Sequence, residues 1–151
     1  MHSPDAFVVG SVLYSDDEYV ANFVRSQFPR VGPTRWEAFK ALGVLRGGSL
    51  IGGVVFHNYH EAANDIEISA AMLHPRWCLP ATVKQLFAYP LAQLKCTRIT
   101  ARTSRRNKPA RTFLERLGFR VEGVLRRAHD GKQDVILYGL LVEQSEWLKG
   151  K

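Results

Sequence analysis

Basic side chains are the residues whose type and distribution most clearly suggest chemistry in this sequence. The 151-residue chain carries 21 lysines and arginines against 14 aspartates and glutamates, which gives a net charge of +7. Many of these cations crowd the C-terminal half, at Lys95, Arg98, Arg102, Arg105, Arg106, Lys108, Arg111, Arg116, Arg120, Arg126, Arg127 and Lys132. Such a surplus favours an anionic partner, which leaves open a phosphorylated cofactor, a nucleic acid, an acidic protein, or a solvated basic face that binds nothing.

The two cysteines argue against metal chemistry. Cys78 and Cys96 show neither CxxC spacing nor a neighbouring His/Cys cluster, so we expect no metal site and reduced thiols in the cytoplasm. The first residues lack the basic and apolar regions of a signal peptide, and no apolar run approaches the roughly 20 residues that cross a bilayer. We therefore expect one cytoplasmic domain over residues 1–151, without membrane contact.

Hydrophobic periodicity predicts the elements that must position these groups. Strands are expected at about residues 7–13, 41–46, 50–59, 65–72, 98–103, 119–127 and 133–141. Helices are expected from a capping box at Ser15–Glu18 to just before Pro29, from Pro80 with a kink at Pro90, and from an Asn107 cap to Gly118. The order β-α-β-β-β-α-β-α-β-β predicts a mixed α/β sheet with helices on its faces.

An ordered set of short motifs begins at residue 65. The motifs are Asp65-Ile66-Glu67-Ile68, Asn107-Lys108-Pro109-Ala110, the run from Phe113 to Phe119, the run from Glu122 to Arg126, and Asp134, Tyr138 and Glu146-Trp147. In this order and spacing they resemble the GNAT superfamily of N-acetyltransferases, and within it the Rim-type branch that includes ribosomal-protein N-terminal acetyltransferases. The first 64 residues resemble the family only in the order of their elements. The resemblance implies a mostly antiparallel sheet with helices on both faces and a V-shaped split between the fourth and fifth strands.

The same resemblance implies that acetyl-CoA binds in this split, with its pyrophosphate on the loop that opens the next helix. A helix N-terminus offers an anion unpaired N–H donors and a partial positive charge. The positions implied for the cofactor are Met72, Leu73, Arg76, Trp77, Cys78, Leu79, Pro80, Ala81, Thr82, Asn107, Ala110, Arg111, Phe113 and Leu114. The loop departs from the family pattern, because Leu79 stands at its central glycine and Pro80 removes a donor.

Acetyl transfer to an amine also needs a base for the amine proton. Glu67 matches the family position that often serves as general base, and His57, at the end of the neighbouring strand, titrates near neutral pH. Structural roles stay open for both: an ion pair between Glu67 and an arginine, and a packed histidine. Leu114 stands where many members carry an acidic tyrosine, for which Tyr59 and Tyr138 are alternatives. Backbone N–H groups near Leu73 are expected to hold the thioester oxygen.

The leading interpretation is therefore an acetyl-CoA-dependent N-acetyltransferase whose acceptor is a protein α-amine, a lysine or a small-molecule amine. The substitutions at Leu79 and Leu114 leave open a non-catalytic GNAT-like binding or regulatory protein. Nucleic acid is not favoured as a partner, since no signature of a nucleic-acid-binding fold accompanies the basic residues. A monomer and a homodimer both fit the sequence.

Overall fold

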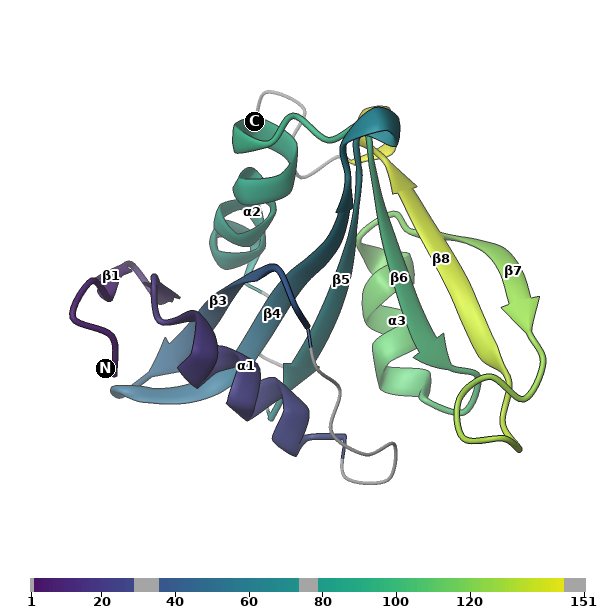
Figure 1. Cartoon of the computed structure of the whole chain (residues 1–151), viewed down its shortest axis with the longest axis horizontal. Coiled ribbons are helices and arrows are strands. Elements are labelled where there is room, and N and C mark those ends of the chain that lie inside the picture. Colours follow the sequence, from purple (N-terminus) through teal and green to yellow (C-terminus); the bar gives the residue numbers. More distant parts are fainter. Residues whose placement is uncertain (1, 29–35, 74–78, 146–151) are drawn as a thin grey trace.

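The fold is one eight-stranded sheet with helices on both of its faces (Figure 1). A computed structural model describes residues 2–28, 36–73 and 79–145. The strands are β1 (Phe7–Val9), β2 (Val12–Tyr14), β3 (Phe39–Arg46), β4 (Ser49–His60), β5 (Asp65–Met72), β6 (Arg98–Ser104), β7 (Arg120–Leu125) and β8 (Val135–Leu141), and the helices are α1 (Asp17–Ser26), α2 (Pro80–Ala88) and α3 (Lys108–Arg116). The strand order is β1-β2-β3-β4-β5-β6-β8-β7, and every neighbouring pair is antiparallel except β5 and β6.

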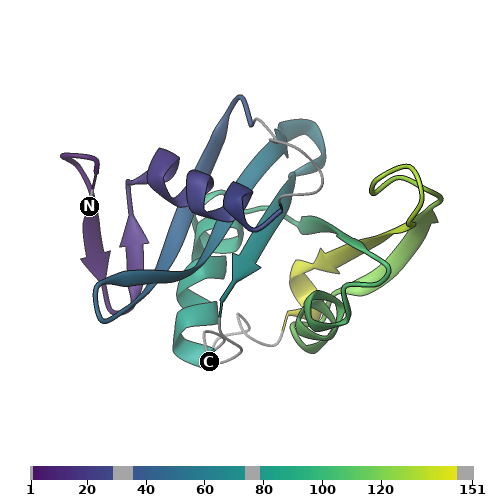
Figure 2. The same cartoon turned by 90° about the horizontal axis from the view of Figure 1, so that it is seen from below.

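Two apolar layers hold the helices to the sheet. Helix α1 buries Val20, Ala21 and Val24 against β3 and β4, on the face that also carries Val55. Helices α2 and α3 pack on the opposite face, where residues such as Phe56 form the larger core cluster. Figure 2 shows α1 on one side of the strands and α2 and α3 on the other. The predicted mixed, mostly antiparallel sheet with helices on both faces is confirmed.

The predicted split lies between β5 and β6. These are the fourth and fifth strands expected from the sequence, because the first expected strand forms both β1 and β2. These strands pair in parallel only along Asp65–Ile68 and Arg98–Ala101, although β5 runs on to Met72 and β6 to Ser104. Beyond the paired residues the two strands diverge as the arms of a V (Figure 1). The sheet therefore opens between them, and the turn that follows β6 flanks the opening.

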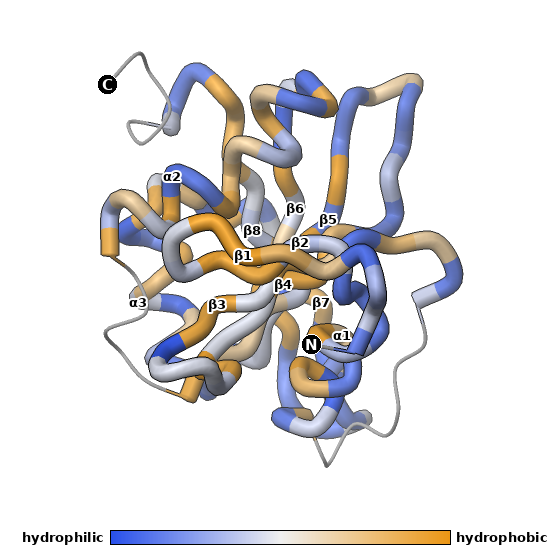
Figure 3. The backbone as a smooth tube through the Cα atoms, turned by 90° about the vertical axis from the view of Figure 1, so that its left-hand side faces the viewer, coloured by the Kyte–Doolittle hydropathy of each residue, from blue (hydrophilic) through white to orange (hydrophobic). Residues whose placement is uncertain are grey.

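The N-terminal strand differs from the prediction. Residues 7–13 form two short strands, paired antiparallel from Phe7↔Tyr14 to Val9↔Val12. Gly10 adopts a φ of +60° in the two-residue loop between them, a conformation that glycine reaches without steric cost. The apolar residues on both sides of the turn read as one continuous strand in the sequence. In the structure β1 lies at the sheet edge (Figure 3), with Phe7, Val8 and Val9 about half exposed.

The start of α1 also differs, because the capping box expected at Ser15–Glu18 does not form. Asp16 is the N-cap residue and makes no side-chain cap hydrogen bond. Its carboxylate instead accepts hydrogen bonds from the backbone N–H groups of His2 and Ser3, both at 2.9 Å. A carboxylate that ties down the N-terminal segment is a competing use that the local motif cannot reveal.

The other helix signals are confirmed. Asn107 Oδ1 accepts a hydrogen bond from Ala110 N at 3.2 Å, and Gly118 ends α3 at a φ of +102°. Pro90 has no N–H to donate, and here α2 passes into a π-helical turn over Tyr89–Gln93, closed by Leu94 N donating to Tyr89 O.

Candidate active site

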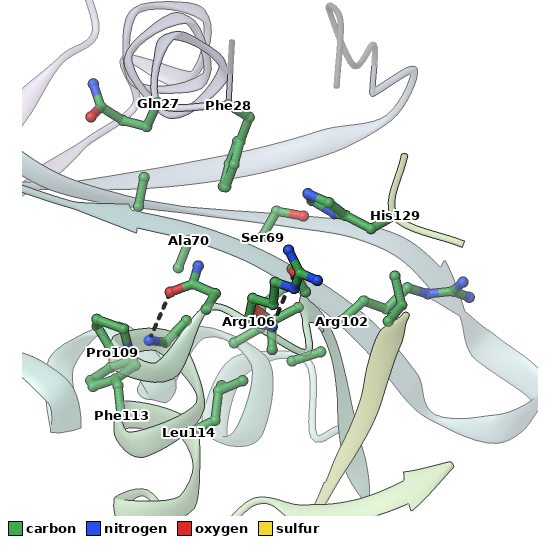
Figure 4. Close-up of a pocket in the computed structure, with 18 of the residues that line it drawn as sticks. Gln27, Phe28, Ser69, Ala70, Arg102, Arg106, Pro109, Phe113, Leu114 and His129 are labelled. Atoms are coloured by element: carbon green, nitrogen blue, oxygen red, sulfur yellow. Dashed lines mark hydrogen bonds between the residues drawn. The ribbon is translucent and has the colours of Figure 1, made fainter. Parts of the chain in front are cut away.

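A cavity of about 590 Å³ occupies the split (Figure 4). Its walls come from the diverging ends of β5 and β6, the start of α3, the end of α1 and the β7–β8 loop. The lining residues are Gln27, Phe28, Ile68, Ser69, Ala70, Ala71, Met72, Ala101, Arg102, Thr103, Ser104, Arg106, Asn107, Pro109, Ala110, Phe113, Leu114, His129, Gln133 and Val135. The split thus brings together segments that are up to about a hundred residues apart in the sequence.

One wall of the cavity is apolar and belongs to α3. Ala110, Phe113 and Leu114 line it from the helix, and Met72 contributes from the end of β5. Asn107, at the start of the same helix, uses its side-chain oxygen for the cap, so its amide nitrogen is the group left to face the cavity. This wall suits an extended, mostly apolar chain with an amide that can pair with Asn107.

The backbone of β5 also supplies the cavity with polar groups. Leu73 N donates to Ile51 O on β4 at 2.7 Å, so this N–H points away from the split. In an antiparallel ladder the N–H groups alternate between the two sides of a strand, which directs those of Ala70 and Met72 toward β6. Because β6 has diverged at this level, the donor of Ala70 faces the cavity, three residues before the Leu73 position expected from the sequence.

A buried histidine stands behind the opposite wall. His57 on β4 is 6% exposed, and its Nε2 lies 2.8 Å from Ser69 Oγ in a hydrogen bond. Burial lowers the pKa of His57, the carboxylate of Glu67 raises it in part, and Arg102 lowers it further. Its Nδ1 has no hydrogen-bond partner among the described residues. His57 is therefore held neutral, and Ser69 connects it to the cavity.

Glu67 takes part in a polar cluster on the same face of the sheet. One carboxylate oxygen lies 3.4 Å from Arg102 Nε, and the other accepts a hydrogen bond from Asn58 Nδ2 at 3.1 Å. Glu67 stands directly opposite His57 in the β4–β5 register. Neither predicted catalytic residue lines the cavity, whereas their partners Arg102 and Ser69 both do.

The predicted cofactor positions fall into separate groups. Leu79 and Thr82 line a second cavity, of about 320 Å³, on the α2 side of β3 and β4. Pro80 and Ala81 are exposed at the start of α2, and Leu73 is exposed at the end of β5. Arg76, Trp77 and Cys78 lie outside the described residues.

Arg111 and Tyr138 form a structural pair away from the cavity lining. Arg111 Nε donates to the hydroxyl of Tyr138 at 3.0 Å, and this hydroxyl donates to Glu115 at 2.7 Å. Tyr138 is fully buried, and burial raises its pKa. These contacts fasten α3 to β8, while the alternative tyrosine, Tyr59, is exposed on β4.

Several lining residues were not identified from the sequence. Ser69 and Arg102 lie on the same face of the sheet as Glu67, so the period of two, applied across the β5–β6 pair, would have indicated them. Gln27 and Phe28 at the end of α1, and Arg106 and His129 in loops, carry no local signal, because only the tertiary fold brings them to the split.

Neither a metal cluster nor a membrane helix is found in residues 2–28, 36–73 and 79–145. No group of three or more histidine, cysteine or acidic side chains there is arranged to hold a metal ion. No helix of that described part has the length and apolarity to span a membrane.

Comparison with known families identifies the class of protein. The sequence model described as an acetyltransferase (GNAT) domain matches residues 5–120, so the chain belongs to this family. The match includes most of the N-terminal part, where the sequence resembled the family only in the order of its elements. The chain is an N-acetyltransferase by family and fold. No curated protein sequence matches the chain significantly.

Solved structures of acetyltransferases share the fold. Ribosomal-protein-S5-alanine acetyltransferase from Vibrio fischeri superposes with a TM-score of 0.69 at 16% identity, over 94% of this chain and 98% of that one. RimJ from Mycobacterium smegmatis, solved with CoA-disulfide, gives a TM-score of 0.61 at 24% identity, over 72% of this chain and 57% of that one. A point mutant of the spermidine N-acetyltransferase SpeG from Vibrio cholerae gives a TM-score of 0.63 at 21% identity, over 75% of this chain and 70% of that one.

Proposed function

We propose that this chain transfers an acetyl group from acetyl-CoA to an α-amine held at the open side of the split. The observation that carries the proposal is the cavity between β5 and β6, with its apolar α3 wall and the backbone donor of Ala70. The apolar wall and the Asn107 amide fit a pantetheine arm, which consists of short alkyl segments joined by amides. The α2 N-terminus at Leu79–Thr82 offers backbone donors for the phosphates.

Acetyl-CoA supplies an acetyl group already activated as a thioester. The acceptor nitrogen forms a bond to the carbonyl carbon while the carbon–sulfur bond breaks, sulfur leaves as thiolate, and nitrogen gives up one proton. In this proposal the N–H of Ala70 donates to the carbonyl oxygen as negative charge develops there; its support is the β4–β5 register and the place of Ala70 in the cavity lining. A thiol with a pKa of about 8.5 leaves readily near neutral pH, so Leu114 is compatible with turnover although it supplies no acid.

Two groups are candidates for the amine proton. His57 is buried and neutral, and Ser69 connects it to the cavity by one hydrogen bond of 2.8 Å. Glu67 stands directly opposite His57 in the β4–β5 register, and its carboxylate reaches the cavity through a water molecule in this proposal. Both groups lie on the α1 side of the sheet, opposite the α3 wall, so the amine approaches from that side.

The acceptor class follows from proton affinity. The structural neighbours include one enzyme named for an alanine of ribosomal protein S5 and one named for spermidine. A protein α-amine has a pKa of about 7.7–8.0 and a lysine side chain one of about 10.4. A site whose candidate bases are a neutral histidine and an ion-paired carboxylate suits the amine that is more often neutral.

Isothermal titration tests the cofactor part of this proposal. We expect one CoA per chain, and weaker binding of adenosine 3′,5′-bisphosphate, which lacks the pantetheine arm that the split would hold. Equal affinity for both ligands would show that the pantetheine arm does not bind in the split. Absence of CoA binding at millimolar concentration would overturn the proposal in favour of a non-catalytic binding protein.

A further inference from the structure

The polar end of the split cavity is cationic. Arg102 and Arg106 line it together with His129, and none of the described residues that line the cavity is an aspartate or a glutamate. In Figure 4 the side chains of Ser69, Arg106 and His129 point into the same end, away from Pro109 and Phe113 on the apolar wall. Both arginines are exposed. Arg102 shares its charge with Glu67, whereas the charge of Arg106 is available to a ligand in the cavity.

Two carboxylates on neighbouring segments, Glu67 and Asp134, are already engaged. Glu67 is shared between Arg102 and Asn58. Asp134 pairs with Arg105 at 3.2 Å and accepts a hydrogen bond from Arg127 N at 3.0 Å. Within residues 2–28, 36–73 and 79–145, Arg106 forms no ion pair, so its positive charge is not neutralised by the described part of the protein.

The backbone holds Arg106 in place. Arg106 N donates to Ser104 Oγ at 3.2 Å, and Ser104 Oγ donates to Gln133 Oε1 at 2.6 Å. Ser104 is buried, and Gln133 is fixed in turn by Asp130, which accepts a hydrogen bond from Gln133 N at 2.8 Å. The β6–α3 turn and the β7–β8 loop are thus joined, and this junction sets both Arg106 and His129 at the cavity.

We propose that this end of the cavity selects an acceptor that carries a carboxylate close to its reactive α-amine. The inference rests on the proposed acetyl-transferase function and names its substrate class. Arg106 and Arg102 attract the carboxylate, while the amine is directed to Ser69 at the apex of the split. Two sources share this chemistry: a free amino acid and a peptide that begins with an acidic residue.

A polyamine acceptor is disfavoured by the same charges. Its second ammonium group would enter a cavity whose described lining includes two arginines and no carboxylate. The proposed place for the cofactor phosphates is the α2 N-terminus, which lines a separate cavity, so the arginines at the split remain for the acceptor. The charge of the acceptor site therefore argues against a polyamine such as spermidine, for which one of the fold relatives is named.

Steady-state acetylation of matched acceptors tests the selection. The probes are the tripeptide amides Glu-Ala-Ala, Gln-Ala-Ala and Lys-Ala-Ala, together with free glutamate, its α-amide and spermidine. We expect kcat/KM for Glu-Ala-Ala amide to exceed that for the Gln peptide by about tenfold and that for the Lys peptide by more, which corresponds to about 1.4 kcal/mol for each factor of ten. Free glutamate above the peptide identifies an amino-acid acceptor, and the reverse order identifies a peptide. Equal rates for the Glu and Gln peptides, or a preference for spermidine, overturn the inference.

The variant Arg106→Gln tests the residue itself, and Arg116→Gln, an exposed arginine farther along α3, is its control. We expect Arg106→Gln to raise KM for the Glu peptide about tenfold, to leave the Gln peptide unchanged and to preserve KM for acetyl-CoA, whereas the control changes none of these. A rise in KM for acetyl-CoA alone would assign Arg106 to the cofactor and overturn the inference. If CoA binding is intact while acceptor charge has no effect, only this inference fails; loss of CoA binding is the failure of the proposed function.

Discussion

Glu67 illustrates how one side chain can hold a structural and a chemical role at the same time. Both of its oxygens have partners, Arg102 and Asn58, so the ion pair considered from the sequence is present. Yet Glu67 lies beside the apex of the split and directly opposite His57. The two roles make different demands on the side chain: the ion pair needs a charge, and the proton transfer needs a lone pair of suitable basicity.

Glu67→Gln separates these roles. Glutamine keeps the shape and one acceptor but binds no proton, so we expect kcat to fall by about 10²–10⁴-fold, the usual contribution of a general base. The affinity for CoA should stay close to that of the wild type. The measurement is steady-state turnover at saturating acceptor, with Arg102→Gln as the matched variant that breaks the same ion pair and leaves the carboxylate. If both variants lose the same activity, the pair is structural and His57 is the remaining base.

Asn107 poses a similar question at the start of α3. Its oxygen forms the cap, and the residue lines the cavity, so its amide nitrogen is left to donate to a ligand. We expect Asn107→Ala to weaken CoA binding by more than the loss of the cap weakens the fold, which is about 1 kcal/mol. Calorimetric titration and thermal unfolding of the same sample measure the two effects. Asn107→Asp retains a capping oxygen and lacks the amide donor; unchanged CoA affinity in both variants would leave Asn107 as a cap alone.

The sequence identified these two residues through motifs but could not assemble the cavity around them. Glu67 and Asn107 sit in short ordered strings, whereas Phe28 follows a helix and His129 lies in a hairpin loop, without a local pattern that marks either. Such residues become neighbours only after β5 and β6 separate. A single sequence contains no signal that shows which distant segments meet at the cavity.

At the scale of elements, the close approach of α1 to the sheet depends on glycines in β3 and β4. Gly53 faces the helix, and a Cβ built there would lie 2.9 Å from a Val20 methyl and 3.1 Å from a Val24 methyl. Hydrophobic periodicity located α1 and both strands correctly, since their apolar residues repeat at 3.6 and at two residues. It did not locate the Gly10 turn or the use of Asp16, because an edge strand and an N-terminal tether both depend on tertiary partners.

Gly53→Ala should push α1 away from β4. Overpacking of this kind costs about 1–3 kcal/mol. Gln27 and Phe28, which follow α1, line the cavity on the side from which the amine is proposed to approach, so this side should move with the helix. We expect a lower free energy of unfolding and a higher KM for the acceptor, measured by urea denaturation and steady-state kinetics. Gly123→Ala on β7 is the control, because a Cβ there meets no atom within 4 Å. Equal stability of the two variants would show that α1 adjusts without cost.

At the scale of the whole molecule, a narrow hinge joins two parts of the sheet. Strands β1–β5 form one part and β6–β8 the other, and they share four paired positions between β5 and β6. Asp65 reinforces the hinge by accepting hydrogen bonds from Arg98 at 3.2 Å and from Thr100 at 2.9 Å. The hinge holds the base of the V together, so the arms can stay apart and keep the cavity open. The buried His57 lies close to this junction and couples protonation to the stability of the whole fold.

The free energy of unfolding should therefore depend on pH through His57. Burial lowers the pKa of this histidine in the folded protein below its ordinary value of about 6.5, so below that pH the unfolded chain binds a proton that the folded chain refuses. The contribution of neutral His57 to the free energy of unfolding is fully present above about pH 6.5 and is lost as the pH falls through the lower pKa of the folded protein. We expect urea denaturation between about pH 7.5 and pH 5 to show a shallower fall in stability for His57→Gln than for the wild type. His60→Gln, at an exposed position on the same strand, should keep the wild-type slope. Parallel curves for all three proteins would mean that the pKa of His57 is the same in the folded and the unfolded protein. His57 would then not be the neutral group that Ser69 connects to the cavity.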